Sequence, residues 1–139
     1  MALVLTDVGA DEILKAFFNN DWPTSKDLTL NLFINDVTPA QTGISYTEAA
    51  GGGYSAKTLS NGSWTVTTAN DPSDATYAKQ TFTFTGALTD DATIYGYYVT
   101  NDDSVVLWAE KFSTPFTPVA NGDYVEVTPA FQLSSGTPA

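Results

Sequence analysis

The chain of 139 residues contains no cysteine, no histidine and no arginine, and its five basic residues are all lysines. Histidine is the usual general base near neutral pH, cysteine is the readiest nucleophile, and arginine is the usual bidentate ligand of anions. Their absence excludes Ser-His-Asp and Cys-His catalysis, histidine-based zinc sites and arginine-finger mechanisms. Only carboxylate, lysine, hydroxyl and tyrosine chemistry is left. We therefore expect no enzymatic activity, no metal site and no cofactor.

Basic charge is also scarce, because sixteen acidic residues face the five lysines and give a formal net charge of −11. Nucleic acids and anionic lipids attract proteins through clusters of lysine and arginine. We therefore expect neither a nucleic-acid partner nor a membrane partner. No apolar run approaches the ~20 residues that span a bilayer. The start of the chain lacks the basic region of a signal peptide and reaches Asp7 within seven residues.

The length and the 42% share of apolar residues are typical of one domain with its own core. No internal repeat is visible, which counts against a solenoid or a propeller. The pattern divides the single domain 1–139 into an N-terminal helical segment over 1–22, a β-sandwich over 27–133 and a flexible tail over 134–139.

The first segment has the pattern of an amphipathic helix. Thr6 is a suitable N-cap, acidic residues follow in the first turns, and Asn19-Asn20-Asp21 supplies a stop. Gly9 should weaken this helix slightly. Its apolar residues fall largely on one stripe, namely Val8, Ile13, Leu14, Phe17 and Phe18. The stripe should lie against an apolar surface, either of its own domain or of a neighbouring subunit.

From residue 28 onward apolar residues alternate with polar ones, which indicates β-strands. Threonine fills many of the polar positions, because its β-branched side chain favours extended backbone and presents a hydroxyl to water. The expected strands cover 28–34, 63–68, 81–85, 93–100, 105–112 and 124–133. The sequence therefore predicts a mainly β protein, an antiparallel β-sandwich or jelly roll with one N-terminal α-helix.

The connection from Pro39 to Tyr54 lacks a regular pattern and contains Gly51-Gly52-Gly53. No Lys-Ser/Thr pair follows these glycines at the spacing of a phosphate-binding loop. The glycines therefore indicate flexibility, and we predict a surface excursion.

Acidic side chains cluster in two predicted turns, at Asp90-Asp91 and at Asn101-Asp102-Asp103. The strand between the turns separates them by roughly 25–30 Å, at ~3.3 Å per residue. The two clusters therefore cannot share one metal ion. Solvated turn carboxylates are the favoured interpretation, and a loose Ca²⁺ site at one turn is the alternative.

Glu110 is the best candidate for a catalytic carboxylate. It shares a strand face with Trp108 and Phe112 if the alternation holds, while Lys111 points to the other face. Glycosidase chemistry would need a second carboxylate across a groove. An exposed strand glutamate is the favoured interpretation.

Aromatic residues allow three interpretations. They can fill the core, form a subunit interface, or stack on sugar rings as in carbohydrate-binding β-sandwiches. The residues concerned are Trp22, Trp64, Tyr95, Tyr97, Tyr98 and Trp108.

Short sequence motifs in a fixed order resemble those of a known family. They are Leu5–Gly9, Leu30–Pro39, Gly51–Tyr54, Ser63–Val66, Phe82–Gly86, Ile94–Thr100, Leu107–Glu110, Asn121–Asp123 and Thr128–Phe131. In this order, over about residues 3 to 133, the chain resembles a family of small virion proteins of tailed bacteriophages. These motifs contain no catalytic signature.

The resemblance implies one of two kinds of virion part. Decoration or cement proteins, often trimers, bind the outer surface of the capsid and bridge subunits of the major capsid protein; fibre or adaptor components are the other kind. The absence of a fibre shaft favours a cement protein, as a homo-oligomer with a trimer favoured. A fibre, adaptor or glycan-binding module for host attachment is the alternative. The predicted interface residues are Phe17, Phe18, Trp22, Tyr46 and Tyr54.

Overall fold

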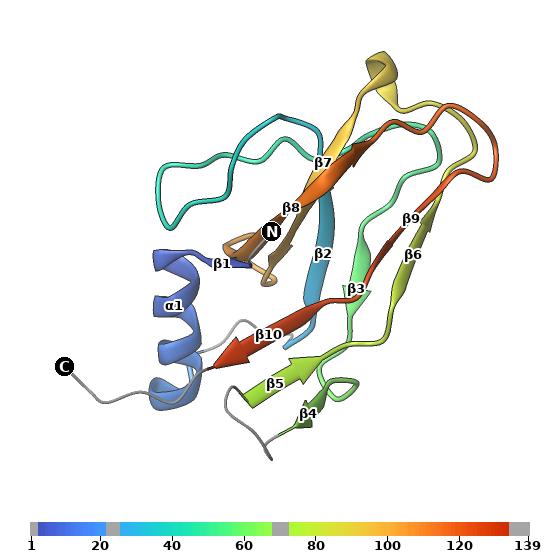
Figure 1. The fold of residues 1–139 in the computed structure, drawn as a ribbon. Coiled ribbons are helices and arrows are strands. Elements are labelled where there is room, and N and C mark those ends of the chain that lie inside the picture. The colour runs from blue at the N-terminus through green and yellow to red at the C-terminus, as the bar shows by residue number, and fades with distance from the viewer. Residues whose placement is uncertain (1–2, 22–25, 68–72, 134–139) are drawn as a thin grey trace.

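Antiparallel strands and an N-terminal helix make up the structure, a computed structural model that describes residues 3–21, 26–67 and 73–133 (Figure 1). The helix begins as α1 (Asp7–Leu14) and continues as the π-helical turn η1 (Lys15–Asn19). Thr6 caps it as predicted, because its hydroxyl accepts a 2.9 Å hydrogen bond from the Gly9 amide. Asn20 ends it in the left-handed conformation. The predicted mainly β, antiparallel class with one N-terminal helix is confirmed.

A five-stranded sheet forms the first layer. Its order is β1-β8-β7-β2-β3, and every neighbouring pair is antiparallel. The strands are β1 (Val4–Leu5), β2 (Leu28–Phe33), β3 (Lys57–Leu59), β7 (Ile94–Thr100) and β8 (Val106–Phe116). The long central pair β7 and β8 joins the helical end of the molecule to the opposite end, where the turn η2 (Thr89–Asp91) projects (Figure 1).

A narrower second layer runs diagonally across the first (Figure 1). It consists of a three-stranded sheet of order β10-β5-β4 and the two-stranded pair β6-β9. The Tyr77 amide donates a 2.8 Å hydrogen bond to the Pro129 carbonyl between the two sheets and so links them. The strands are β4 (Thr65–Thr67), β5 (Ser73–Thr76), β6 (Gln80–Thr83), β9 (Tyr124–Val127) and β10 (Ala130–Leu133).

The main core lies between the two layers. Alternate residues of β2 meet alternate residues of β6 and β9, as the period-two pattern predicts, and β7 and β8 add residues to this core on both sides of their register shifts. Leu30, Leu32 and Phe84 are fully buried there. The buried members of this core are Leu28, Leu30, Leu32, Ala49, Leu59, Phe82, Phe84, Leu88, Ile94, Tyr97, Val99, Leu107, Trp108, Val125 and Val127.

A second, smaller core covers the outer face of the five-stranded sheet. Phe33, Tyr98 and Ala109 are buried there under side chains of the segment between β2 and β3. That segment is held by a bridge between Phe33 and Glu48. The predicted surface excursion is therefore a covering layer for the sheet.

Gly51, Gly52 and Gly53 have a backbone conformation that depends on glycine. All three residues have positive φ, which side-chain-bearing residues rarely adopt. A Cβ atom on Gly52 would lie 2.6 Å from the Gly86 carbonyl oxygen. The glycines therefore allow a close backbone approach that fixes the covering segment to the end of the sheet. Among the described residues no helix is long and apolar enough to cross a membrane.

Candidate functional site

The end of the helix carries the most exposed aromatic pair among the predicted interface residues. Phe17 and Phe18 are 81% and 74% exposed. Their rings pack edge to face, with the ring centroids 5.1 Å apart. Leu14, one turn earlier, is 56% exposed. Leu14, Phe17 and Phe18 are spaced three and four residues apart and so share one helix face. We call these three residues the apolar knob.

The position of the helix explains why the apolar knob faces outward. Gly9 is buried against the backbone of Leu107 in β8, where an added Cβ atom would overlap that backbone. The Thr6 amide donates a 3.0 Å hydrogen bond to the Leu107 carbonyl. The helix is therefore held to the sheet through its first turn. Of the two alternatives for the apolar stripe, packing on its own domain does not hold for Val8, Leu14, Phe17 and Phe18, which are exposed.

A groove lies beside the apolar knob, between the helix and the start of β2. Its volume is about 340 Å³, and a second hollow of about 210 Å³ shares part of its lining. Ile13, Leu28 and Trp64 line both. These residues come from three segments that only the tertiary structure brings together. No pattern in the sequence indicates this groove.

Tyr46 lies on the covering segment and not on an exposed surface. Its ring stacks on Tyr98 at 5.2 Å and contacts Phe33 at 5.0 Å. Its hydroxyl oxygen is buried and has no hydrogen-bond partner among the described residues, and burial raises the pKa of Tyr46. Tyr46 therefore contributes to the smaller core.

Tyr54 is likewise tied into the domain. Its hydroxyl accepts a 3.1 Å hydrogen bond from the Leu32 amide and donates a 3.1 Å hydrogen bond to Glu48, and its ring stacks on Phe82. Burial is the main cause that raises its pKa well above the ordinary value. Trp22, the fifth predicted interface residue, lies outside the described residues.

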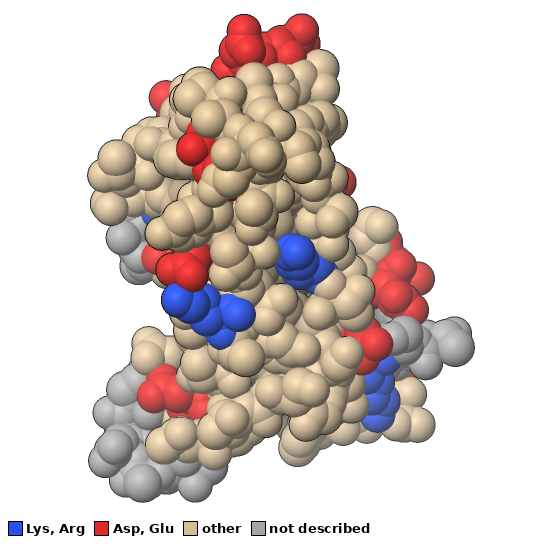
Figure 2. Space-filling model, turned by 90° about the vertical axis from the view of Figure 1, so that its right-hand side faces the viewer, with Lys and Arg blue, Asp and Glu red and all other residues tan. Residues whose placement is uncertain are grey.

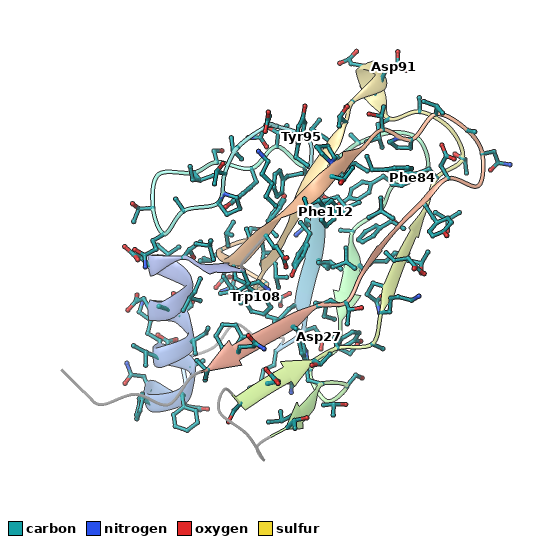
Figure 3. The ribbon with its side chains drawn as sticks, in the orientation of Figure 1. Asp27, Phe84, Asp91, Tyr95, Trp108 and Phe112 are labelled. Atoms are coloured by element: carbon teal, nitrogen blue, oxygen red, sulfur yellow. The ribbon has the colours of Figure 1, made fainter. Side chains whose placement is uncertain are left out.

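The aromatic residues considered for sugar stacking lie mostly inside the molecule. Tyr97, Tyr98 and Trp108 are buried, and Trp64 and Tyr95 are half-buried. Trp108 points from β8 toward β10, where its ring contacts Phe131 at 5.2 Å (Figure 3). A sugar-binding platform needs exposed rings, so Tyr97, Tyr98 and Trp108 contribute to the core instead.

Glu110 finds its partner in the neighbouring strand. The Tyr97 hydroxyl, directly opposite in the β7–β8 register, donates a 2.8 Å hydrogen bond to a carboxylate oxygen of the half-buried Glu110. Burial and this carboxylate raise the pKa of Tyr97 well above its ordinary value. Lys111 points the other way as predicted and forms an ion pair with Asp36. Glu110 is therefore a structural acceptor and is less exposed than predicted.

The two acidic turns lie at opposite ends of β7, as expected. The Asp90-Asp91 turn projects into solvent, and both residues have positive φ. In the other turn, the Asn101 side-chain oxygen accepts hydrogen bonds from the Asp103 and Val105 amides. Among the described residues, no group of three or more acidic side chains is placed to hold a metal ion.

Charge is distributed unevenly over the molecule. Acidic side chains are spread over the face in Figure 2, with one group at the end that carries Asp91, and the lysines of the same face lie apart from one another (Figures 2 and 3). Several lysines are neutralised by ion pairs, such as Lys15 with Asp11 at 2.6 Å and Lys79 with Glu126 at 2.8 Å. The basic patch of a nucleic-acid-binding protein does not form on this face.

The chain matches no protein-family model, no curated protein and no solved structure.

Proposed function

We propose that this protein is a structural component of a tailed-bacteriophage virion, a decoration or cement protein on the outer surface of the capsid. It binds there as an oligomer, with a trimer favoured, and bridges neighbouring subunits of the major capsid protein. The order of short sequence motifs, which resembles that of phage virion proteins, supports a place in the virion. The missing reactive residue types support a role in assembly and not in catalysis.

The observation that carries the proposal is the apolar knob on an acidic protein. Two phenylalanines more than 70% exposed are unusual on a chain with a net charge of −11. Exposed apolar patches of this kind mark interaction sites. The surrounding carboxylates oppose contact between free copies, since like charges repel. A shell that offers many sites lets modest individual contacts accumulate into stable attachment.

The proposal is tested by comparing phage virions that contain this protein with virions from which its gene has been deleted. We expect the deleted virions to release DNA at lower temperature and under milder osmotic shock. Addition of the purified protein should restore retention, while the same protein unfolded beforehand should not. Equal DNA retention with and without the protein would contradict a cement function.

A further inference from the structure

The apolar knob is too small to form a stable dimer interface by itself. An aromatic side chain presents roughly 150–250 Å² of surface. At the exposures of Leu14, Phe17 and Phe18, the apolar knob offers roughly 400 Å² of apolar surface. A stable interface buries about 800 Å² on each partner. Two copies that met only through their apolar knobs would therefore lack the area of a stable interface, and any partner must also contact surface around the apolar knob.

The charge of the helix also opposes a second copy. The segment 7–21 contains four acidic residues and one lysine, a net charge of −3, and that lysine is paired with Asp11 and Glu12. Two such helices placed face to face would bring like charges together. A partner surface with lysine or arginine around an apolar pocket would complement both features.

We propose that the apolar knob inserts into an apolar pocket, rimmed by basic residues, on the protein of the capsid shell. This inference rests on the proposed function and names the surface that performs it. The apolar knob and the acidic turn at Asp91 lie at opposite ends of the molecule (Figure 3). Docking through the helix directs this acidic turn away from the shell and into solution. Contacts between copies within an oligomer then use other surfaces.

The test uses purified phage shells that lack this protein and measures binding of the purified chain to them. The double variant Phe17→Ser/Phe18→Ser removes both aromatic rings of the apolar knob. Val119→Ser/Tyr124→Ser is the matched control, since both control side chains are more than 55% exposed elsewhere. We expect the first variant to bind at least about 30-fold more weakly, in the range of hot-spot losses. The control should bind within about threefold of the unmodified protein.

Two outcomes separate this inference from the proposed function. Failure of the unmodified protein to bind shells overturns the proposed function. Binding of the unmodified protein that Phe17→Ser/Phe18→Ser leaves unchanged overturns only the docking surface. Sedimentation of the free protein tests whether a second copy covers the apolar knob instead. If the unmodified protein forms an oligomer and the double variant does not, a second copy covers the apolar knob and the inference is wrong.

Charge at the rim is tested by two single variants of exposed aspartates. Asp21→Asn, at the end of the helix, should slow association with the shells by about threefold, while Asp91→Asn at the far end should not change it. Added salt should weaken binding of the unmodified protein. Equal effects of the two variants, or binding that salt strengthens, would contradict a basic rim.

Discussion

Two pairs of consecutive aromatic residues have opposite surroundings in this protein. Tyr97 and Tyr98 lie in β7 and are 4% and 8% exposed, whereas Phe17 and Phe18 lie in the helix and are 81% and 74% exposed. In a strand, consecutive side chains point to opposite faces. Tyr97 therefore enters the main core and Tyr98 the smaller core.

In the helix the two phenylalanines lie on neighbouring positions of one side, and no element of the described residues buries them. A strand pair is buried only when both faces of its sheet are covered. The segment between β2 and β3 covers the face of the sheet on which Tyr98 lies, and Tyr46 of this segment stacks on the Tyr98 ring. The comparison shows that aromatic content alone does not distinguish a core from an interaction surface, because burial depends on what covers each face.

The largest difference should appear when one member of each pair is truncated. Tyr97→Ala removes a buried ring and leaves Glu110 without its hydrogen-bond donor, so it should lower the free energy of unfolding by about 3–5 kcal/mol. Phe17→Ala removes an exposed ring and should change it by less than about 0.5 kcal/mol. Urea denaturation measures both. A similar loss for the two variants would show that the helix end is buried in solution.

A smaller effect is expected at the contact that holds the helix to the sheet. Gly9→Ala places a methyl group against the Leu107 backbone and should destabilise the protein by about 1–3 kcal/mol, although alanine favours an isolated helix. Gly62→Ala is the matched control, since no atom of the described residues lies within 4 Å of its added methyl group. Thermal unfolding checks the pair. If Gly9→Ala stabilised the protein, the helix would not lie against β8 as described.

The smallest effect on stability at neutral pH is expected from ionisation of the tyrosine hydroxyls, which changes the free energy of unfolding only in alkaline solution. Burial raises the pKa of Tyr98 from 10.0 to about 12, and it raises the pKa values of Tyr54 and Tyr97 in the same direction. Because the folded pKa lies above the unfolded one, this contribution to stability is complete below pH 10 and is lost as pH rises through about 12.

Circular dichroism and tyrosinate absorbance, followed together from neutral to alkaline pH, test this expectation. Ionisation of the buried tyrosines should coincide with unfolding, and Tyr98→Phe should make the loss of stability with pH less steep. Ionisation of every tyrosine near pH 10 with the fold intact would be evidence against their burial.

Much of the fold follows from local pattern. The alternating segments predicted from residue 28 onward correspond to β2, β4, β6, β7, β8 and the pair β9 and β10. The strands β1, β3 and β5 were not predicted, because their sequences (Val-Leu, Lys-Thr-Leu and Ser-Asp-Ala-Thr) do not alternate apolar with polar residues. β5 consists of Ser73–Thr76 and is a strand because it pairs with β4 and β10 on either side.

The candidate site was predictable only in part. Phe17 and Phe18 are marked by their place on a helical stripe, but Tyr46 and Tyr54 cannot be told from surface residues without knowing that their segment returns over the sheet. Gly9 shows the same limit in reverse. Local propensity treats it as a weak point, whereas the structure requires the absence of a side chain there.

The sequence by itself determined the chemistry and the local geometry. Without histidine, cysteine or arginine, whole classes of mechanism are excluded, and the two periodicities select a helix followed by strands, since both properties depend only on composition or near neighbours. The tertiary structure alone decided which aromatic residues are covered. The contact of Gly9 with Leu107 joins residues almost a hundred positions apart, and it is this contact that turns Phe17 and Phe18 toward solvent.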